Sequence, residues 1–453
     1  MAQVLDIEQL IDGQKLGRFN LNLLVWSFLA MFADGYEITA IAFAAPELVR
    51  DWGLQTASMG PVFSASLFGI LFGAPALGYV GDRFGRKTAI IIALAICGVA
   101  TLAMAFAQSV DQLLALRFFT GIGIGGLMPN TVSLTSELSP KRFRAMLIVL
   151  MFTGITLGGG APSVIAAWLV PQFGWPVLFV IGGVFPLLIA VCLYFTLPES
   201  VKFLALQPSR AAALRRTLRK VRPDVAIPGE AEFSVHRSAP QGNVGIREIV
   251  SPGLRWITLL LWFCFGMTLM ANYFLNSWMP ILFEASGLQA DDAALASGLY
   301  HVGGTLGGLL ISVLLDRYGI IVIAAFLLFA GPVVAAIGIA ELPFGALLGL
   351  SLGAGVFVLG AQFGNNAAAG MLYPTEIRAK AVGLAFSVGR FGSILGPLLG
   401  GLLIAKNWPL AWLFAAAAVP LVSGAIAALI LTRICFVRFN GLQIDDKAAD
   451  RLG

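Results

Sequence analysis

Long apolar stretches are the feature that most restricts the fold of this chain. Segments of about 20 residues with few or no charges recur along the whole sequence, and a helix of about that length crosses the hydrocarbon core of a bilayer. Of the 453 residues, 58% are hydrophobic and only 12% are charged, whereas about 25% are charged in a typical soluble domain. A soluble protein of this length needs far more polar residues to cover its surface. The composition therefore excludes a water-soluble fold.

The apolar stretches predict an all-α polytopic membrane protein with twelve transmembrane helices. An outer-membrane barrel would instead show alternating segments of about 10 residues, which this sequence lacks. The predicted spans are 19–45, 57–81, 87–107, 111–136, 145–170, 175–197, 255–283, 293–315, 319–340, 343–372, 379–405 and 409–435. The predicted domains are two six-helix bundles, a polar linker between them and two polar ends: 19–197, 255–435, 198–254, 1–18 and 436–453.

The positions of the basic residues predict the orientation of the helices. With the N-terminus in the cytoplasm, all but four of the 29 Lys and Arg residues fall on the cytoplasmic side. The exceptions are Arg50, Arg117, Arg390 and Lys406. Such asymmetry sets orientation in inner membranes, so we expect a bacterial-type inner-membrane protein with both termini and the linker in the cytoplasm. The same rule explains the basic run of the linker, which contains a short amphipathic helix at 209–221, without a nucleic-acid partner.

The second half of the sequence repeats the first at a constant offset of 234 residues. The matching segments are Gly53-Leu54-Gln55 with Gly287-Leu288-Gln289, Gly69 and Gly73 with Gly303 and Gly307, Asp82-Arg83-Phe84-Gly85 with Asp316-Arg317-Tyr318-Gly319, and Pro140, Arg144 and Ala145 with Pro374, Arg378 and Ala379. Matches between glycines alone would carry little weight, but the charged and proline matches share the same offset. Two parallel six-helix halves, with a binding site between them at mid-membrane, are typical of secondary transporters.

Residues 78–87, Gly-Tyr-Val-Gly-Asp-Arg-Phe-Gly-Arg-Lys, resemble the loop between the second and third helices of the major facilitator superfamily. The weaker copy at 316–319 lacks the trailing basic pair, as is common in that family. Residues 117–123 on the fourth helix and 154–162 on the fifth are similar to two further signatures of the superfamily. The resemblance covers essentially the whole chain and implies the major facilitator fold.

Within the superfamily, Asp34-Gly35-Tyr36-Glu37 is similar to the Asp-Gly-Tyr-Asp signature of the aromatic acid:proton symporters. The stretches 125–130, Gly-Gly-Leu-Met-Pro-Asn, and 389–392, Gly-Arg-Phe-Gly, fit the same group. The second acid is Glu37 where the signature usually has Asp, a departure that bears on substrate preference or coupling. The resemblance implies an aromatic carboxylate as substrate and a proton as the coupling ion.

Ionisable side chains inside the spans mark the candidate site, because each costs about 2.5 kcal/mol or more there. Asp34 lies 16 residues after Arg18, which is about 24 Å along a helix, and Glu37 lies on the same helix face. Two carboxylates so close in a low dielectric disfavour double ionisation, which suits a proton-coupling site. Arg117 lies at a similar depth on the fourth helix. It either forms a structural ion pair with these acids or takes part in gating.

Arg390 lies at mid-membrane on the eleventh helix, and its planar guanidinium matches a carboxylate. We predict that it binds an anionic substrate, with a pair to Asp34 or Glu37 as the alternative. His301, at mid-membrane on the eighth helix, is either a hydrogen-bonded structural residue or a member of the site with its neighbour Tyr300. Polar side chains of the seventh and tenth helices belong to the site or join helices. They are Asn272, Asn276, Gln362, Asn365 and Asn366.

The charged residues next to the second helix predict a conformational latch. Asp82 can pair with Arg144 or with helix termini in one transport state and release in the other, and Glu137 is a candidate partner. The residues assigned to the latch are Asp82, Arg83, Arg86, Glu137, Arg144, Asp316 and Arg317.

Together these features predict a proton-coupled secondary transporter that imports an organic, and by resemblance aromatic, carboxylate by alternating access. The alternative is a proton-driven antiporter that exports drugs or metabolites, which the run 154–162 weakly favours. No enzyme activity is expected, since the sequence shows no catalytic nucleophile constellation and no GxSxG, HExxH or Asp-rich metal loop. The GxGxxG match at 121–126 lies inside a span with no preceding strand, so nucleotide binding is not expected either. We expect a monomer with no metal and no cofactor besides the coupling proton. Its partners are the organic acid, protons and the lipid bilayer.

Overall fold

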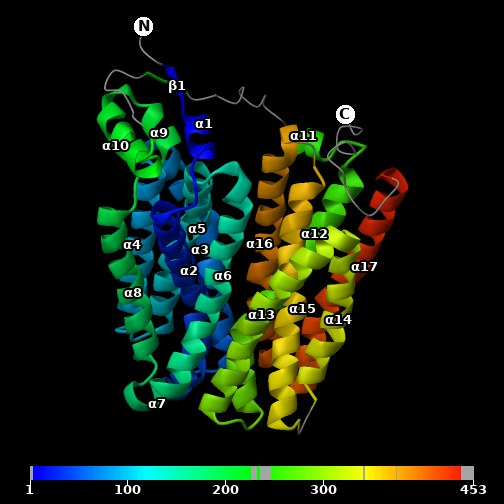
Figure 1. Ribbon diagram of the computed structural model, residues 1–453. Helices are drawn as coiled ribbons and strands as arrows, with labels where there is room; N and C mark the ends of the chain where they lie inside the picture. Colours follow the sequence, from blue (N-terminus) through cyan, green and yellow to red (C-terminus); the bar gives the residue numbers. More distant parts are fainter. Residues whose placement is uncertain (1–3, 226–231, 235–245, 340–341, 374, 440–453) are drawn as a thin grey trace. The chain divides into compact units, whose positions relative to one another are not determined.

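The computed structural model describes residues 4–225, 232–234, 246–339, 342–373 and 375–439 (Figure 1). In these residues, eleven helices are long and apolar enough to cross a membrane. A further apolar helix, α14 (Ile321–Ile337), has 17 residues, close to the minimum for a span. The predicted all-α membrane fold is confirmed.

The elements of the first half and the linker follow one another in the order expected from the apolar stretches. They are β1 (Val4–Asp6), α1 (Ile7–Asp12), α2 (Arg18–Asp51), η1 (Thr56–Ser58), α3 (Met59–Phe84), α4 (Arg86–Met104), α5 (Val110–Leu138), α6 (Lys141–Trp168), α7 (Val170–Phe173), α8 (Pro176–Thr196), α9 (Val201–Ala205), η2 (Pro208–Arg210), α10 (Ala211–Val221), β2 (Glu232–Ser234) and α11 (Ile246–Ile249). The second half contains α12 (Arg255–Ala285), α13 (Ala290–Tyr318), α14, α15 (Phe344–Met371), α16 (Thr375–Ala405) and α17 (Leu410–Phe439). The amphipathic helix predicted at 209–221 is η2 followed by α10.

The chain divides into two compact units that differ from its two sequence halves. Unit 1 takes the described residues of Met1–Ile38, Phe68–Gly159 and Pro176–Pro240, and unit 2 takes those of Thr39–Leu67, Gly160–Trp175 and Gln241–Gly453. The ends of α2 and α6 and the start of α3 therefore group with the second half of the sequence.

Contacts inside unit 2 explain this division. Arg50 at the end of α2 forms an ion pair with Glu284 of α12, with Nη2 and Oε2 3.6 Å apart. The Ser64 hydroxyl of α3 donates to the carbonyl of Ile394 in α16 over 2.9 Å. The Phe63 ring meets Trp278 edge to face, with centroids 5.0 Å apart. Side chains from one end of the first-half helices are thus packed against second-half helices.

The internal repeat is visible in how the helices approach each other. Gly73 of α3 lies against the backbone of Ile122 in α5, and Gly307 of α13 lies against that of Val356 in α15. These four residues obey the same offset of 234 that relates the two halves of the sequence. A β-carbon on either glycine would overlap the facing backbone, so each half uses a small residue to bring the same two helices together.

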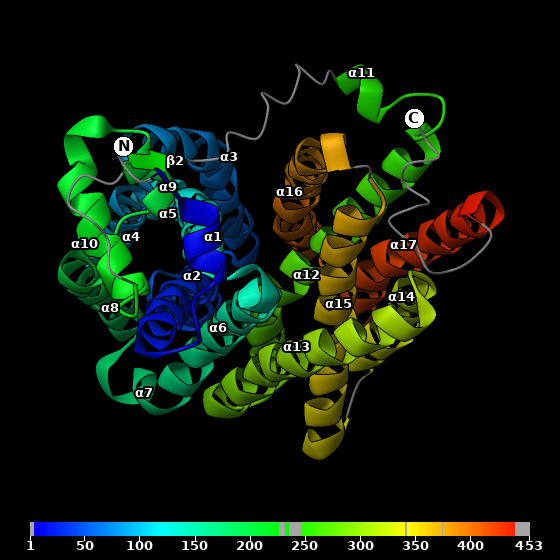
Figure 2. The same cartoon turned by 45° about the horizontal axis from the view of Figure 1, so that its top comes forward.

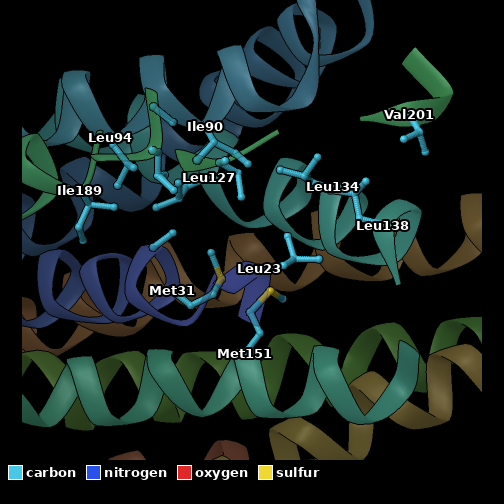
Figure 3. Packing of buried hydrophobic residues seen from close by; sticks show 14 of the residues in the cluster. Leu23, Met31, Ile90, Leu94, Leu127, Leu134, Leu138, Met151, Ile189 and Val201 are labelled. Carbon is cyan, nitrogen blue, oxygen red and sulfur yellow. The ribbon is translucent and has the colours of Figure 1, made fainter. Parts of the chain in front are cut away.

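The core of unit 1 runs from the membrane helices into the linker. Figure 3 shows side chains of α2, α4, α5, α6 and α8 meeting in one apolar cluster. Buried members of the same cluster, Leu214, Leu218 and Val221, come from α10. Ile7 and Ile11 of α1 complete it. The apolar face of α10 is therefore covered by protein.

The polar N-terminal segment is folded onto unit 1, which the sequence did not predict. β1 pairs in parallel with β2 of the linker. The Asp12 carboxylate accepts a hydrogen bond of 2.9 Å from the backbone N–H of Lys141 at the start of α6. Burial acts to raise the pKa of Asp12, but the hydrogen bonds and charge of Lys141 outweigh it and hold that pKa below its usual value. This segment thus ties the linker to the helix ends.

We expect Gly73→Ala to destabilise the protein by about 1–3 kcal/mol, the usual cost of overpacking. Its β-carbon would lie 2.6 Å from the Ile122 α-carbon, so α3 and α5 must move apart. Gly78→Ala is the matched control on the same helix, because nothing lies within 4 Å of the β-carbon it adds. Thermal unfolding in detergent, followed by tryptophan fluorescence, measures both. Equal melting temperatures for the two variants would contradict this account.

Candidate functional site

Two acidic side chains are buried one helical turn apart on α2. Asp34 is 4% exposed and Glu37 is 1% exposed, and both belong to unit 1. The charge of Glu37 interacts with those of Asp34 and Arg117. The structure thus places Asp34 and Glu37 on one helix and close to Arg117, while their role in proton coupling stays a prediction.

The hydrogen bonds around Glu37 differ from a simple ion pair. Arg117 of α5 donates from Nη1 to the backbone carbonyl of Glu37 over 2.8 Å. Thr101 of α4 donates its hydroxyl to Glu37 Oε2 over 2.5 Å. Among the described residues, the other carboxyl oxygen, Oε1, is buried and has no hydrogen-bond partner. Glu37 is thus a deeply buried carboxyl group with only part of its hydrogen-bonding capacity used.

Sequence reasoning missed two residues that hold this cluster. Thr101 carries no charge and lies in an apolar stretch, so nothing in the sequence singled it out. Tyr36, between the two acids, donates its hydroxyl to the backbone carbonyl of Leu178 in α8 over 2.8 Å. Its position inside the Asp-Gly-Tyr-Glu motif was the available signal. Together they fix α2 against α4 and α8.

The second polar group lies in unit 2. Tyr300 of α13 donates its hydroxyl to Asn272 Oδ1 of α12 over 2.7 Å. Asn365 of α15 donates to the Thr268 hydroxyl of α12 over 3.1 Å. Asn365 therefore joins helices, which was one of the two roles predicted for these amides. Thr268 was another uncharged partner that the sequence did not reveal.

Two amide oxygens of this group keep unused acceptor capacity. Gln362 donates from Nε2 to Asn366 Oδ1 over 3.2 Å. Within the described chain, Gln362 Oε1 and Asn276 Oδ1 are buried without a hydrogen-bond partner. A buried amide oxygen that lacks a donor can accept a hydrogen bond from a hydroxyl group of a ligand.

Arg390 and His301 also belong to unit 2. Arg390 on α16 is half-buried, and no acidic side chain of the described residues forms an ion pair with it. His301 is 6% exposed, and its ring meets Tyr300 edge to face with centroids 5.5 Å apart. Arg390 therefore keeps a guanidinium charge that is not paired with an acid of the described residues.

The predicted latch forms a charged network within unit 1. Arg86 at the start of α4 pairs with Asp82 of α3 over 2.5 Å. It also approaches Glu137 of α5, with Nε and Oε1 3.9 Å apart. Glu137 in turn accepts a hydrogen bond from the Ser200 hydroxyl. Asp82 and Glu137 thus share Arg86.

Glu199, which the sequence analysis did not assign, is central to the same network. Its Oε1 accepts hydrogen bonds from the backbone N–H of Lys87 over 3.0 Å and of Ser200 over 2.9 Å. It therefore caps the N-terminus of α4, where backbone donors have no helical partner. Gly85 precedes this helix with φ +112°, and a β-carbon there would overlap the Glu199 carboxyl. Burial raises the pKa of Glu199 although several backbone N–H groups oppose this.

Four other predicted latch residues lie outside this network. Arg144 donates to the carbonyl of Ser139 over 3.3 Å, and so Asp82 is held by Arg86 rather than by Arg144 here. The side chains of Arg83, Asp316 and Arg317 are exposed. The position that matches Arg86 in the second half is Ile320, so the Asp82–Arg86 pair cannot recur there.

Comparison with known proteins agrees with this geometry. The Major Facilitator Superfamily family model matches residues 27–365 and 261–435. The chain belongs to the major facilitator superfamily. It is 37% identical to the 4-hydroxybenzoate transporter PcaK of Pseudomonas putida over 95% of this chain and 96% of that protein. It is 35% identical to the gallate transporter of the same organism over 94% of each.

The solved structures support the same fold for this superfamily member. The xylose transporter XylE of Escherichia coli, in a partially occluded inward open conformation, has a TM-score of 0.69 and 17% identity. The match covers 92% of this chain and 98% of that one. At this identity the likeness concerns the fold alone. The chain is a multi-pass membrane transporter and not an enzyme.

We expect the stability of the Glu199→Gln variant to rise relative to wild type as the pH increases from about 4.5 to 8. A raised carboxyl pKa means that the folded protein holds this proton more tightly than the unfolded chain, so wild type loses stability as the pH rises through that pKa. Gln keeps the acceptor oxygen but does not titrate. Glu199→Ala does not titrate either and also removes the cap, so it should be about 1 kcal/mol less stable than Glu199→Gln at every pH. Melting curves across this pH range test both, and a constant difference between Gln and wild type would refute the assignment.

Proposed function

We propose that this protein is a secondary transporter that takes up an aromatic carboxylate together with protons by alternating access. The observation that carries the proposal is the buried Glu37 carboxyl, next to Asp34 and Arg117, in a helix that crosses the membrane. The names of the relatives, which include transporters of 4-hydroxybenzoate and gallate, support an aromatic acid as substrate. The protein is a monomer of the inner membrane with both termini in the cytoplasm.

Uptake of an anion needs a compensating proton. Moving one negative charge into a cell that is negative inside costs about 2.3 kcal/mol per 100 mV. One co-transported proton cancels that cost, and a second would drive accumulation. The proton requires a group that can be neutral while buried and charged when exposed to water.

Glu37 and Asp34 have the chemistry of such a group. Glu37 is almost completely removed from solvent, and its Oε1 has no hydrogen-bond partner in the described residues. A charged carboxylate is costly in such a position, whereas a carboxylic acid is not. Because the charges of Asp34 and Glu37 interact, a negative charge on one acid disfavours a negative charge on the other.

Arg390 is the proposed partner of the substrate carboxylate. It is held in no ion pair with an acid of the described residues, and a guanidinium binds a carboxylate through two parallel hydrogen bonds. The acceptors Asn276 Oδ1 and Gln362 Oε1 suit the ring hydroxyl of a hydroxybenzoate. His301 and Tyr300 add an edge-to-face aromatic pair beside them.

The network of Asp82, Arg86 and Glu137 supports alternating access. It joins α3, α4 and α5 within unit 1, whereas the Arg50–Glu284 pair joins α2 to α12 within unit 2. Export of drugs by antiport has less support. Gly154 and Gly158 lie against the backbone of α2, so helix packing accounts for this run without an export mechanism.

We expect Arg390→Ala to abolish binding of 4-hydroxybenzoate, and Arg390→Lys to leave a weak remnant because the planar fork is lost. Binding to purified protein can be measured by scintillation proximity with labelled substrate. Arg433→Gln is the matched control, since Arg433 is an exposed basic residue on α17. Normal affinity in Arg390→Ala would exclude this role.

We expect Glu37→Gln and Asp34→Asn to lose proton-driven accumulation in proteoliposomes while keeping substrate exchange, which needs no net proton movement. Glu37→Asp should be tolerated because it keeps the carboxyl group. Thr101→Val should shift the external pH at half-maximal accumulation, since its hydroxyl bonds Glu37. Thr120→Val is the control, because the Thr120 hydroxyl donates to the Leu116 carbonyl within its own helix.

Uptake of labelled 4-hydroxybenzoate at several external pH values, with and without an inward proton gradient, tests whether transport is proton-coupled and whether these acids carry the proton. If Asp34→Asn and Glu37→Gln accumulate substrate with the wild-type pH dependence, the coupling group lies elsewhere and His301 is the next candidate. Uptake that ignores the proton gradient in wild type would refute the proposed function.

A further inference from the structure

The linker helix α10 carries a basic face that the transport mechanism does not use. Arg216, Arg219 and Lys220 are exposed on one side of the helix, whose sequence, Ala-Ala-Ala-Leu-Arg-Arg-Thr-Leu-Arg-Lys-Val, contains no acidic residue. In the described part of the chain none of the three forms an ion pair, whereas the nearby Arg222 pairs with Asp224 over 2.8 Å. We call these three residues the α10 basic face.

The opposite face of α10 is already occupied. Leu214, Leu218 and Val221 are at most 5% exposed and belong to the apolar cluster that includes Ile7 and Ile11. An amphipathic helix that enters a bilayer does so with its apolar face, and here that face is covered by protein. Any contact with a membrane must therefore use the α10 basic face and the lipid headgroups.

The C-terminal end of α10 lies close to a membrane helix. Lys220 is near enough to Lys87, in the first turn of α4, for the two charges to repel each other. Lys87 donates from Nζ to the backbone carbonyl of Tyr194 in α8 over 2.7 Å. Figures 1 and 2 both show α10 beside the ends of α4 and α8 at the edge of unit 1.

The end of α8 has the marks of a lipid–water boundary. Tyr194 is 65% exposed and Phe195 is 74% exposed, and their rings meet edge to face. Exposed aromatic side chains at the end of a span are typical of the headgroup level of a bilayer. The ammonium group of Lys87 lies 5.6 Å from the centre of the Tyr194 ring. Lys220 of α10 is thus near Lys87, the basic residue that contacts this aromatic boundary.

We propose that the α10 basic face binds the headgroups of anionic phospholipids in the adjacent leaflet. Three positive charges outside any ion pair, on the helix whose Lys220 is near Lys87 and the exposed aromatics, match a negatively charged lipid surface. Each basic residue near such a surface strengthens binding about fivefold. The attraction is mainly electrostatic, because the large apolar side chains of α10, Leu214, Leu218 and Val221, are buried against unit 1. It fixes the linker, and through β2 and α1 the N-terminal segment, to the membrane surface.

The test uses the purified full chain in nanodiscs of phosphatidylcholine that contain a small fraction of phosphatidylglycerol. Native mass spectrometry then counts the phosphatidylglycerol molecules that stay bound. The variant Arg216→Gln, Arg219→Gln and Lys220→Gln keeps helix propensity and should weaken retention on the order of 100-fold. Arg216→Lys with Arg219→Lys keeps the charge and should retain the lipid.

The matched control removes three exposed basic residues elsewhere: Lys15→Gln, Arg255→Gln and Arg433→Gln. This control variant should retain the lipid as wild type does. Raised salt should weaken lipid retention by wild type, because salt screens surface charges. Equal retention by the α10 variant and wild type would overturn the proposal. Equal loss in the control variant would also overturn it, since net charge rather than this face would then be responsible. A folding defect is detected separately by the melting temperature, which all variants should share.

Discussion

A helix that crosses a bilayer must satisfy its own backbone hydrogen bonds, because the hydrocarbon core offers no water in exchange. This constraint makes the membrane part of the protein entirely helical, and it leaves the side chains to decide how the helices meet. Glycines such as Gly73 and Gly307 let one backbone reach another. Thr101, Asn272 and Asn365 then supply the hydrogen bonds between helices.

The same constraint explains why the charged residues are informative. Outside the spans, Lys and Arg residues are numerous and most have no individual role. Inside them, Asp34, Glu37, Arg117 and Arg390 are too costly to be present without a reason. Arg117 donates from Nη1 to the backbone carbonyl of Glu37 and not, through that nitrogen, to the Glu37 carboxylate. Its positive charge still interacts with that of Glu37. This arrangement is the basis of the proton-coupling role proposed for Glu37.

The linker and the N-terminal segment are packed together on unit 1. The sequence shows them as polar stretches with one amphipathic helix, yet in the structure they are joined by the β1–β2 pair and by Asp12 at the start of α6. Glu199, immediately before the linker helices, caps α4. The network around Arg86 is thus in contact with the start of the linker through Glu137 and Ser200.

The sequence by itself determined the spans, the repeat and the depth of the charged residues. Each of these depends on hydropathy and spacing along one helix, which local sequence fixes. It also placed Asp34 and Glu37 on one face, because three residues make nearly one helical turn. The partners were decided only by the tertiary structure. Thr101 lies 64 residues from Glu37 and Glu199 lies 112 residues from Lys87, so their contact depends on how distant helices rotate and approach, which no local pattern encodes.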